Sequence, residues 1–223
     1  MSSPLVRLLT SSIGRKLLMA ATGLLLIGFL VVHLTGNLLI FVGPTAFNEY
    51  SHALISNHFI YLAEFGLLAL FVLHFAAGIA VTRANRAARP AGYAVKRGAG
   101  HTSNKSLAST TMILSGLVVL AFVPIHLWTF KFGAWYQDPQ TPGMRDLHRL
   151  VLEVFRDPLH VAWYVVAMTV IGFHLWHGFA SGLETLGIAS RRPLRRFSRL
   201  LAVALAGGFA IIPIVLYLRG GSS

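Results

Sequence analysis

The sequence contains no cysteine. This absence excludes disulfide bonds, thiolate nucleophiles, cysteine-ligated iron–sulfur clusters and haem attached through thioether bonds. The sequence also lacks the Gly-x-Gly-x-x-Gly fingerprint that binds a dinucleotide. Any iron–sulfur or flavin chemistry connected with this chain must therefore take place in another protein, and any haem must be held without a covalent bond.

Charged residues are scarce, at 12% of 223 residues, whereas 55% are hydrophobic and the mean hydropathy is +0.67. A chain of this length cannot bury so much apolar surface in one soluble core, so much of it must face lipid. Acidic residues are the scarcest, with 7 Asp+Glu against 19 Lys+Arg and a net charge of +12. Because no basic patch is interleaved with aromatic residues on a soluble domain, we expect anionic lipid rather than nucleic acid to receive this charge.

Long apolar segments account for most of the chain. Each is near the roughly 20 residues that a helix needs to cross a bilayer, and they predict an all-α membrane protein with a single transmembrane domain over residues 1–223. The first is too long for the hydrophobic region of a signal peptide, so we expect a retained helix. Residues 142–157 have apolar positions at helical spacing and predict a short amphipathic helix at the interface. The five predicted spans are residues 17–41, 60–82, 108–130, 161–183 and 200–218.

The basic residues are distributed unevenly between the two sides. Fourteen of the 19 Lys+Arg precede the first span or follow the second and fourth spans. Cytoplasmic segments carry such an excess, so we expect a multi-pass protein of the bacterial cytoplasmic membrane, with its N-terminus in the cytoplasm and its C-terminus outside.

Four of the ten histidines lie inside separate predicted spans: His33, His74, His126 and His174. A single histidine at this depth is more often a hydrogen-bonding group between helices. Four together point to a function, because polar side chains in the membrane are costly. A b-type haem takes a neutral imidazole on each axial face of its iron, so these histidines predict haem-iron ligands.

Depth sorts the four histidines into two groups. At about 1.5 Å of rise per residue, His33 and His126 fall in the outer half of the membrane. His74 and His174 fall nearer the cytoplasmic edge. Two ligands at each of two depths are what two stacked haem b groups require, which predicts His33 with His126 for an outer haem and His74 with His174 for an inner haem. Helices one to four would form the bundle around them.

Small residues lie on the same helix faces as three of these histidines. Gly36, Gly78 and Gly178 are three or four positions from a histidine, and they could give clearance to a flat porphyrin or allow close packing of helices. Pro124 predicts a kink two residues before His126.

His177 follows His174 by three residues on the same face. It could contact a haem propionate or a quinone, or it could form a hydrogen bond between helices. The sequence leaves both roles open.

Several motifs make the chain similar to a known family. The sequence resembles the cytochrome b558 type of membrane anchor in succinate:quinone oxidoreductases, which are the succinate dehydrogenase and fumarate reductase complexes. The resemblance covers residues 11–187. It rests on Ser11-Ser-Ile-Gly-Arg-Lys16, Ala21-Thr-Gly23, His33-Leu-Thr-Gly-Asn-Leu38, Phe47-Asn-Glu-Tyr50, His174-Leu-Trp-His-Gly-Phe-Ala-Ser181 and Thr185-Leu-Gly187.

The resemblance implies one five-helix anchor subunit with two haem b groups, each bridging helices one and three or helices two and four. In that family a flavoprotein oxidises succinate, an iron–sulfur subunit passes the electrons on, and the anchor delivers them to a quinone, commonly menaquinone. The implied partners are therefore a flavoprotein and an iron–sulfur subunit on the cytoplasmic face. The chain itself would carry electron transfer and quinone binding rather than dehydrogenase chemistry.

The place of the quinone is open in the sequence. Glu49, Glu64 and Asn37 could serve quinone chemistry at the outer surface. The segment from Ser11 to Lys16 could line an inner site or hold haem propionates, although positive-inside anchoring explains its basic residues equally well.

Two other functions compete with this interpretation. The histidines could form the path of a proton or ion transporter, in which case no haem absorbance would be seen. Alternatively, the haems could belong to another quinone-linked oxidoreductase, such as a hydrogenase or a formate dehydrogenase.

Overall fold

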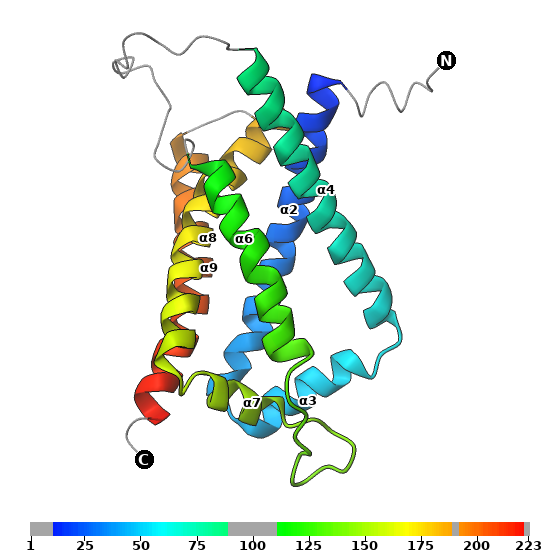
Figure 1. Ribbon diagram of the computed structural model, residues 1–223, viewed down its shortest axis with the longest axis vertical. Coiled ribbons are helices and arrows are strands. Elements are labelled where there is room, and N and C mark those ends of the chain that lie inside the picture. Colours follow the sequence, from blue (N-terminus) through cyan, green and yellow to red (C-terminus); the bar gives the residue numbers. More distant parts are fainter. Residues whose placement is uncertain (1–10, 89–110, 189–191, 221–223) are drawn as a thin grey trace.

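The computed structural model describes residues 11–88, 111–188 and 192–220. In these ranges the regular secondary structure is helical, apart from one isolated antiparallel bridge between Gln137 and Arg145. Figure 1 shows long helices running the length of the molecule, with the two short helices α3 and α7 across one end. The prediction of an all-helical chain with five helices long and apolar enough to cross a membrane is confirmed.

The five candidate spans are longer than, or shifted from, the predicted segments. They cover Ser12–Phe41, Phe59–Ala87, Met112–Lys131, Pro158–Thr185 and Pro193–Gly220. The first, second and fifth helices extend past the predicted apolar runs because the polar and basic residues next to these runs are also helical. The predicted start of the third span, residues 108–110, lies outside the described residues.

The first span consists of α2 (Ser12–Asn37) and a short 3-10 helix, η1 (Leu38–Phe41). Helix α2 begins five residues before the predicted start because Ser11 caps it, its side chain accepting a hydrogen bond from the Gly14 backbone N–H at 2.9 Å. The described chain starts at one end of the bundle, and Gly220 lies at the other end (Figure 1). Which end faces the cytoplasm stays a prediction from the basic residues.

The third span changes its helical geometry next to His126. Helix α6 (Met112–His126) contains Pro124 and continues as a π-helical turn, η2 (Leu127–Lys131). Proline has no backbone N–H and so frees a carbonyl one turn earlier, and local π-helical adjustments can satisfy backbone groups freed in this way in membrane helices. The irregularity expected at Pro124 is thus a wide turn that begins directly after the histidine.

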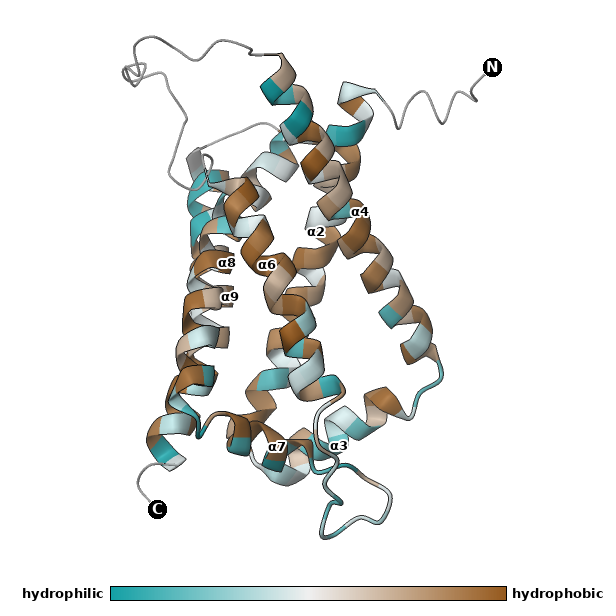
Figure 2. Ribbon diagram, viewed as in Figure 1, coloured by the Kyte–Doolittle hydropathy of each residue, from teal (hydrophilic) through white to brown (hydrophobic). Residues whose placement is uncertain are grey.

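The fourth and fifth spans, α8 (Pro158–Thr185) and α9 (Arg192–Gly220), pack against each other along their lengths. By contrast, α4 (Phe59–Ala87) packs mainly on α2 and touches α6 over only a short stretch. Large side chains of α4 such as Phe59, Leu62 and Phe65 are about 70% exposed. Apolar residues cover the middle of the bundle and polar residues gather at its ends (Figure 2), which fits helices whose outer faces meet lipid.

Two short helices close the end of the bundle at which α4 begins. Helix α3 (Pro44–Ile55) was not predicted, because polar residues interrupt its apolar pattern. Helix α7 (Leu147–Val154) is shorter than the predicted segment 142–157. It starts only at Leu147 because Asp146 caps it, accepting a hydrogen bond from the Arg149 backbone N–H at 3.0 Å.

A buried asparagine joins α3 to the loop before α7. Asn48 is fully buried, and its amide donates to Asp138 at 3.0 Å and to Asp146 at 2.8 Å. Its side-chain oxygen accepts from the His148 backbone N–H at 2.9 Å. We call α3, residues 132–146 and α7 together the end cap. Asn48, which lies on α3, thus bonds polar groups of the other two parts.

Arg145 fastens the end cap to the third span. Its guanidinium is buried and donates to four backbone carbonyls at the end of η2 and just beyond it. A cation at a helix C-terminus compensates both the unpaired carbonyls and the helix dipole. The four accepting residues are Phe130, Lys131, Gly133 and Ala134.

Candidate functional site: two histidine pairs

Two histidines meet in the half of the bundle nearer the end cap. His33 on α2 and His126 at the end of α6 have ring centres 5.8 Å apart, with ring planes perpendicular to each other. We call them the outer pair.

Two more histidines meet nearer the opposite end. His74 on α4 and His174 on α8 have ring centres 6.4 Å apart, with an angle of 74° between the ring planes. We call them the inner pair. The structure therefore brings together the same two combinations that depth predicts, although their binding of haem stays a prediction.

The spacing of each pair matches two ligands of one iron. A metal–imidazole bond is about 2 Å long and the ring centre lies about 1 Å beyond the bonded nitrogen, so two axial imidazoles have centres roughly 6 Å apart. The outer and inner pairs, at 5.8 and 6.4 Å, both fall close to this value.

The set of donor groups also suits haem better than a bare metal ion. Within the described residues there is no cluster of three or more His, Cys, Asp or Glu side chains that could hold a metal. A protein zinc site usually needs three or four such ligands. A pair of imidazoles is sufficient for haem iron because the porphyrin supplies the other four nitrogens.

Aromatic side chains surround the outer pair. Phe29 stacks on His33 with ring centres 5.2 Å apart, and Phe122 stacks on His126 at 5.5 Å. The hydroxyl of Tyr164 lies 3.2 Å from His126 Nδ1. Phe209 of α9 lies 5.7 Å from the His33 ring, so the fifth helix also borders this pair, which the sequence did not indicate.

The inner pair is held by polar contacts instead. His74 Nδ1 lies 3.0 Å from the Met19 carbonyl and 3.2 Å from the Thr22 hydroxyl, both on α2. His174 Nδ1 lies 2.9 Å from the Ser115 hydroxyl on α6. Each inner histidine is thus bonded through Nδ1 to a neighbouring helix, which leaves its Nε2 free of these contacts.

Gly23 makes room for the His74 ring. A Cβ at position 23 would lie 2.8 Å from His74 Cε1, closer than carbon atoms approach without strain. Gly23, rather than Gly36, Gly78 or Gly178, is therefore the glycine whose lack of a side chain makes room for an imidazole.

The three glycines predicted to give clearance behave differently from one another. Around Gly78 and Gly178 an added Cβ would meet nothing within 4 Å, so space is open there. At Gly36 an added Cβ would lie 2.5 Å from the ring of Tyr50. The clearance at Gly36 therefore admits Tyr50 of α3, which fits the alternative of close helix packing, and the role of these glycines in haem binding stays a prediction.

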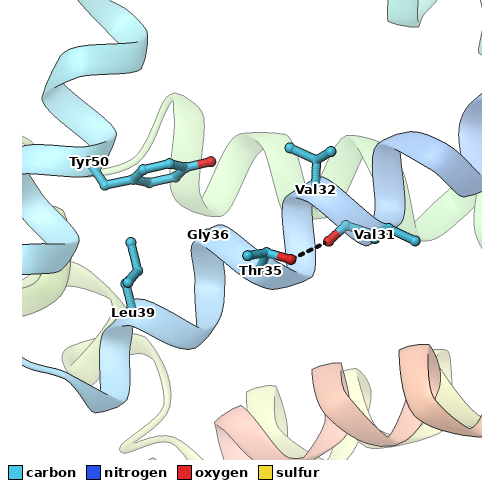
Figure 3. Close-up of a pocket in the computed structure, with 6 residues that line it drawn as sticks. All are labelled: Val31, Val32, Thr35, Gly36, Leu39 and Tyr50. Atoms are coloured by element: carbon cyan, nitrogen blue, oxygen red, sulfur yellow. Dashed lines mark hydrogen bonds between the residues drawn. The ribbon is translucent and has the colours of Figure 1, made fainter.

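A small groove lies beside Gly36 at the depth of the outer pair. Its volume is about 220 Å³ and its walls are almost entirely apolar. Figure 3 shows Tyr50 reaching from α3 across Gly36, with its hydroxyl toward α2. Val32 and Gly36 flank His33 along the helix. The lining residues are Val31, Val32, Thr35, Gly36, Leu39 and Tyr50.

The carboxylates and the amide predicted for quinone chemistry do not converge. Glu64 pairs with Lys131, which links α4 to η2. Asn37 donates to the His33 carbonyl at 2.8 Å, one turn back on its own helix. Glu49 is exposed on α3. Of the predicted residues, Glu49 is next in sequence to the groove residue Tyr50, and Asn37 is next to the groove residue Gly36.

The candidates at the opposite end have local structural roles. Ser11 caps α2, and Arg15 Nε donates to the Ser11 carbonyl at 3.3 Å. His177 is partly buried one turn beyond His174 on α8. Both of its suggested roles stay predictions.

Comparisons of the chain with protein-family models, with curated proteins and with solved structures returned no match.

Proposed function

We propose that this chain is the di-haem cytochrome b membrane anchor of a succinate:quinone oxidoreductase, which relays electrons from an iron–sulfur partner to a membrane quinone. The observation that supports it most is the pairing of four histidines from four different spans into two couples with ring centres 5.8 and 6.4 Å apart. The motifs shared with cytochrome b558 anchors support the choice of this enzyme among haem proteins.

The residues that would hold the cofactors are His33 with His126 for the outer haem and His74 with His174 for the inner haem. Each haem, when bound, supplies one-electron redox chemistry. The chain contributes neutral imidazoles in an apolar setting, and it sets their distance and tilt through helices that cross the same layer. Phe29 and Phe122 restrict the rotation of the outer rings by stacking on them.

The electron donors would dock at the end where α2 begins. With no cysteine in the chain, the iron–sulfur clusters and the flavin belong to partner subunits. Polar residues gather at this end (Figure 2), and the inner pair lies nearer to it. The described basic residues there are Arg15, Lys16, Arg83, Arg86, Arg195, Arg196 and Arg199.

The quinone would bind at the groove beside Gly36. At about 220 Å³ the groove is smaller than the pockets of roughly 300–1,000 Å³ that enclose drug-sized ligands, so it suits a quinone ring whose isoprenoid tail extends into lipid. Menaquinone is the expected quinone. The Tyr50 hydroxyl would donate a hydrogen bond to a quinone carbonyl, and exposed Glu49 would deliver protons from outside.

The test is the haem content of the purified protein and of single-histidine variants. The wild type should give a low-spin b-type spectrum after dithionite reduction, with two haems per chain. His74→Ala and His174→Ala should each lose the inner haem, and His33→Ala and His126→Ala the outer haem. His58→Ala, which removes an exposed histidine, is the matched control and should keep both.

Other outcomes would favour the competing functions. A protein without haem that conducts protons in liposomes would support the transporter. Co-purification under mild detergent distinguishes the enzymes: a flavoprotein that oxidises succinate supports the proposal, whereas hydrogenase or formate dehydrogenase subunits would replace it.

A further inference from the structure

The two histidine pairs differ in what binds their outward-facing nitrogens. At the inner pair, Nδ1 of both imidazoles is hydrogen-bonded to another helix. At the outer pair, His126 Nδ1 has a single contact, with the Tyr164 hydroxyl. Among the described residues, the imidazole of His33 has ring contacts but no hydrogen bond. The inner pair therefore has polar partners on both imidazoles, whereas the outer pair has one on His126 alone.

The chemistry of the acceptors determines where the inner protons lie. The Met19 carbonyl can only accept, so His74 Nδ1 must carry the hydrogen that joins them at 3.0 Å. The Thr22 hydroxyl donates to the Leu18 carbonyl at 2.7 Å, so toward His74 it too is an acceptor.

The same reasoning applies to His174. The Ser115 hydroxyl has one proton, and when it donates that proton to the Met112 carbonyl at 3.0 Å, its lone pair faces His174 Nδ1 at 2.9 Å and accepts the ring proton. Ser115 is buried, so no competing water is expected at this bond. The contacts of both inner histidines therefore favour the proton on Nδ1, which leaves the lone pair on Nε2.

We infer that Ser115 and Thr22, with the Met19 carbonyl, are positioning residues that hold both inner histidines in the Nδ1–H tautomer and thereby set the redox potential of the metal they ligate. The effect on the redox potential rests on the proposed function, because it needs a bound haem. The tautomer of the two histidines does not depend on it. An imidazole that donates Nδ1–H to an acceptor is a more basic ligand through Nε2. A more basic ligand stabilises ferric over ferrous iron, so these bonds lower the potential of the inner haem.

The deciding variant is Ser115→Ala, which removes the acceptor at His174 and leaves the ligand itself. Loss of such a partner commonly lowers the metal affinity or the activity of a site 10- to 100-fold, and we take the lower end as the expected size of the effect. A tenfold shift of the ferric–ferrous equilibrium toward ferrous iron corresponds to about 59 mV for one electron. The inner haem should therefore titrate about 59 mV higher, and the outer haem should not move. Thr22→Val should shift it less, because the Met19 carbonyl remains.

Two controls separate this role from general packing. Ser115→Thr keeps the hydroxyl and should restore the wild-type potential. Thr169→Ala removes an exposed hydroxyl of α8 that bonds only to the Val165 carbonyl and should change neither potential. An unchanged inner potential in Ser115→Ala, in protein that retains two haems, would overturn the inference while leaving the proposed function intact.

A second measurement does not depend on haem. Nitrogen-15 labelling of histidine reports the tautomer by NMR in haem-free protein from haem-deficient cells, because an imidazole bound to iron through Nε2 carries its proton on Nδ1 whether or not Ser115 is present. His174 should carry its proton on Nδ1 in the wild type and lose this preference in Ser115→Ala. That result would support the positioning role even if protein from haem-replete cells also held no haem, which would refute the proposed function alone, whereas a proton on Nε2 in the wild type would overturn the inference itself.

Discussion

Replacing Gly23 by alanine should selectively damage the inner pair. The new Cβ would lie 2.8 Å from His74 Cε1, and the ring must withdraw by about 0.6 Å to reach the 3.4 Å at which ordinary contact begins. Functional sites tolerate displacements of only about 0.5 Å. The His74 ring cannot withdraw freely, because its Nδ1 is bonded at 3.0 Å to the carbonyl of Met19, which lies on α2 together with Gly23. Overpacking of this kind costs about 1–3 kcal/mol.

If this cost falls on haem binding, inner-haem affinity should drop roughly 5- to 150-fold, since each 1.4 kcal/mol is a factor of ten. The assay is haem per chain and the reduced spectrum of protein purified at limiting haem, where Gly23→Ala should approach one haem per chain. Gly28→Ala is the matched control, because Gly28 is an exposed residue of the same helix with nothing within 4 Å of an added Cβ. Full and equal occupancy of both haems in Gly23→Ala would show that the steric reasoning is wrong.

The end cap supports two further predictions. Asn48→Ala removes a buried amide that bonds Asp138, Asp146 and the backbone of His148, so it should lower the free energy of unfolding by about 2–3 kcal/mol; thermal unfolding in detergent measures this, and a midpoint equal to that of Asn37→Ala, which breaks only a bond within one helix, would contradict it. Acid should destabilise the end cap in two steps. Burial lowers the pKa of His148, so the contribution of neutral His148 to stability is complete above its ordinary pKa near 6.5 and is lost as the pH falls below that value. The backbone N–H of Gln140, with the Asn48 side chain, lowers the pKa of Asp138. The contribution of ionised Asp138 to stability is therefore complete above about pH 4 and is lost as the pH falls below it. Hydrogen exchange of α3 and α7 between pH 7 and 3 follows both steps, and exchange that does not accelerate beyond its intrinsic pH dependence would refute them.

The spans and the depth of the four histidines could be predicted because they depend on local quantities. A helix rises by about 1.5 Å per residue whatever surrounds it, so counting residues from the ends of an apolar run places His74 and His174 at one depth and His33 and His126 at another. Helix α3 was not predicted because its local pattern does not indicate a helix. Its 12 residues are polar enough to be taken for a loop, and the burial of Phe47 in the core and of Asn48 between two aspartates makes the helix part of the fold.

Tertiary structure alone decided what surrounds each histidine. The Met19 carbonyl is a backbone group without any sequence signature, and it contacts His74 across 55 positions. In the sequence, nothing distinguishes Ser115 from other serines in apolar helices. The packing of α6 against α8 brings its hydroxyl to His174. Gly36 and Gly23 look alike along α2, but one faces Tyr50 and the other faces His74. Sequence determines how deep a residue lies in a membrane helix, whereas its neighbours depend on the rotation and crossing of that helix against others, which are set by contacts between residues far apart in the chain.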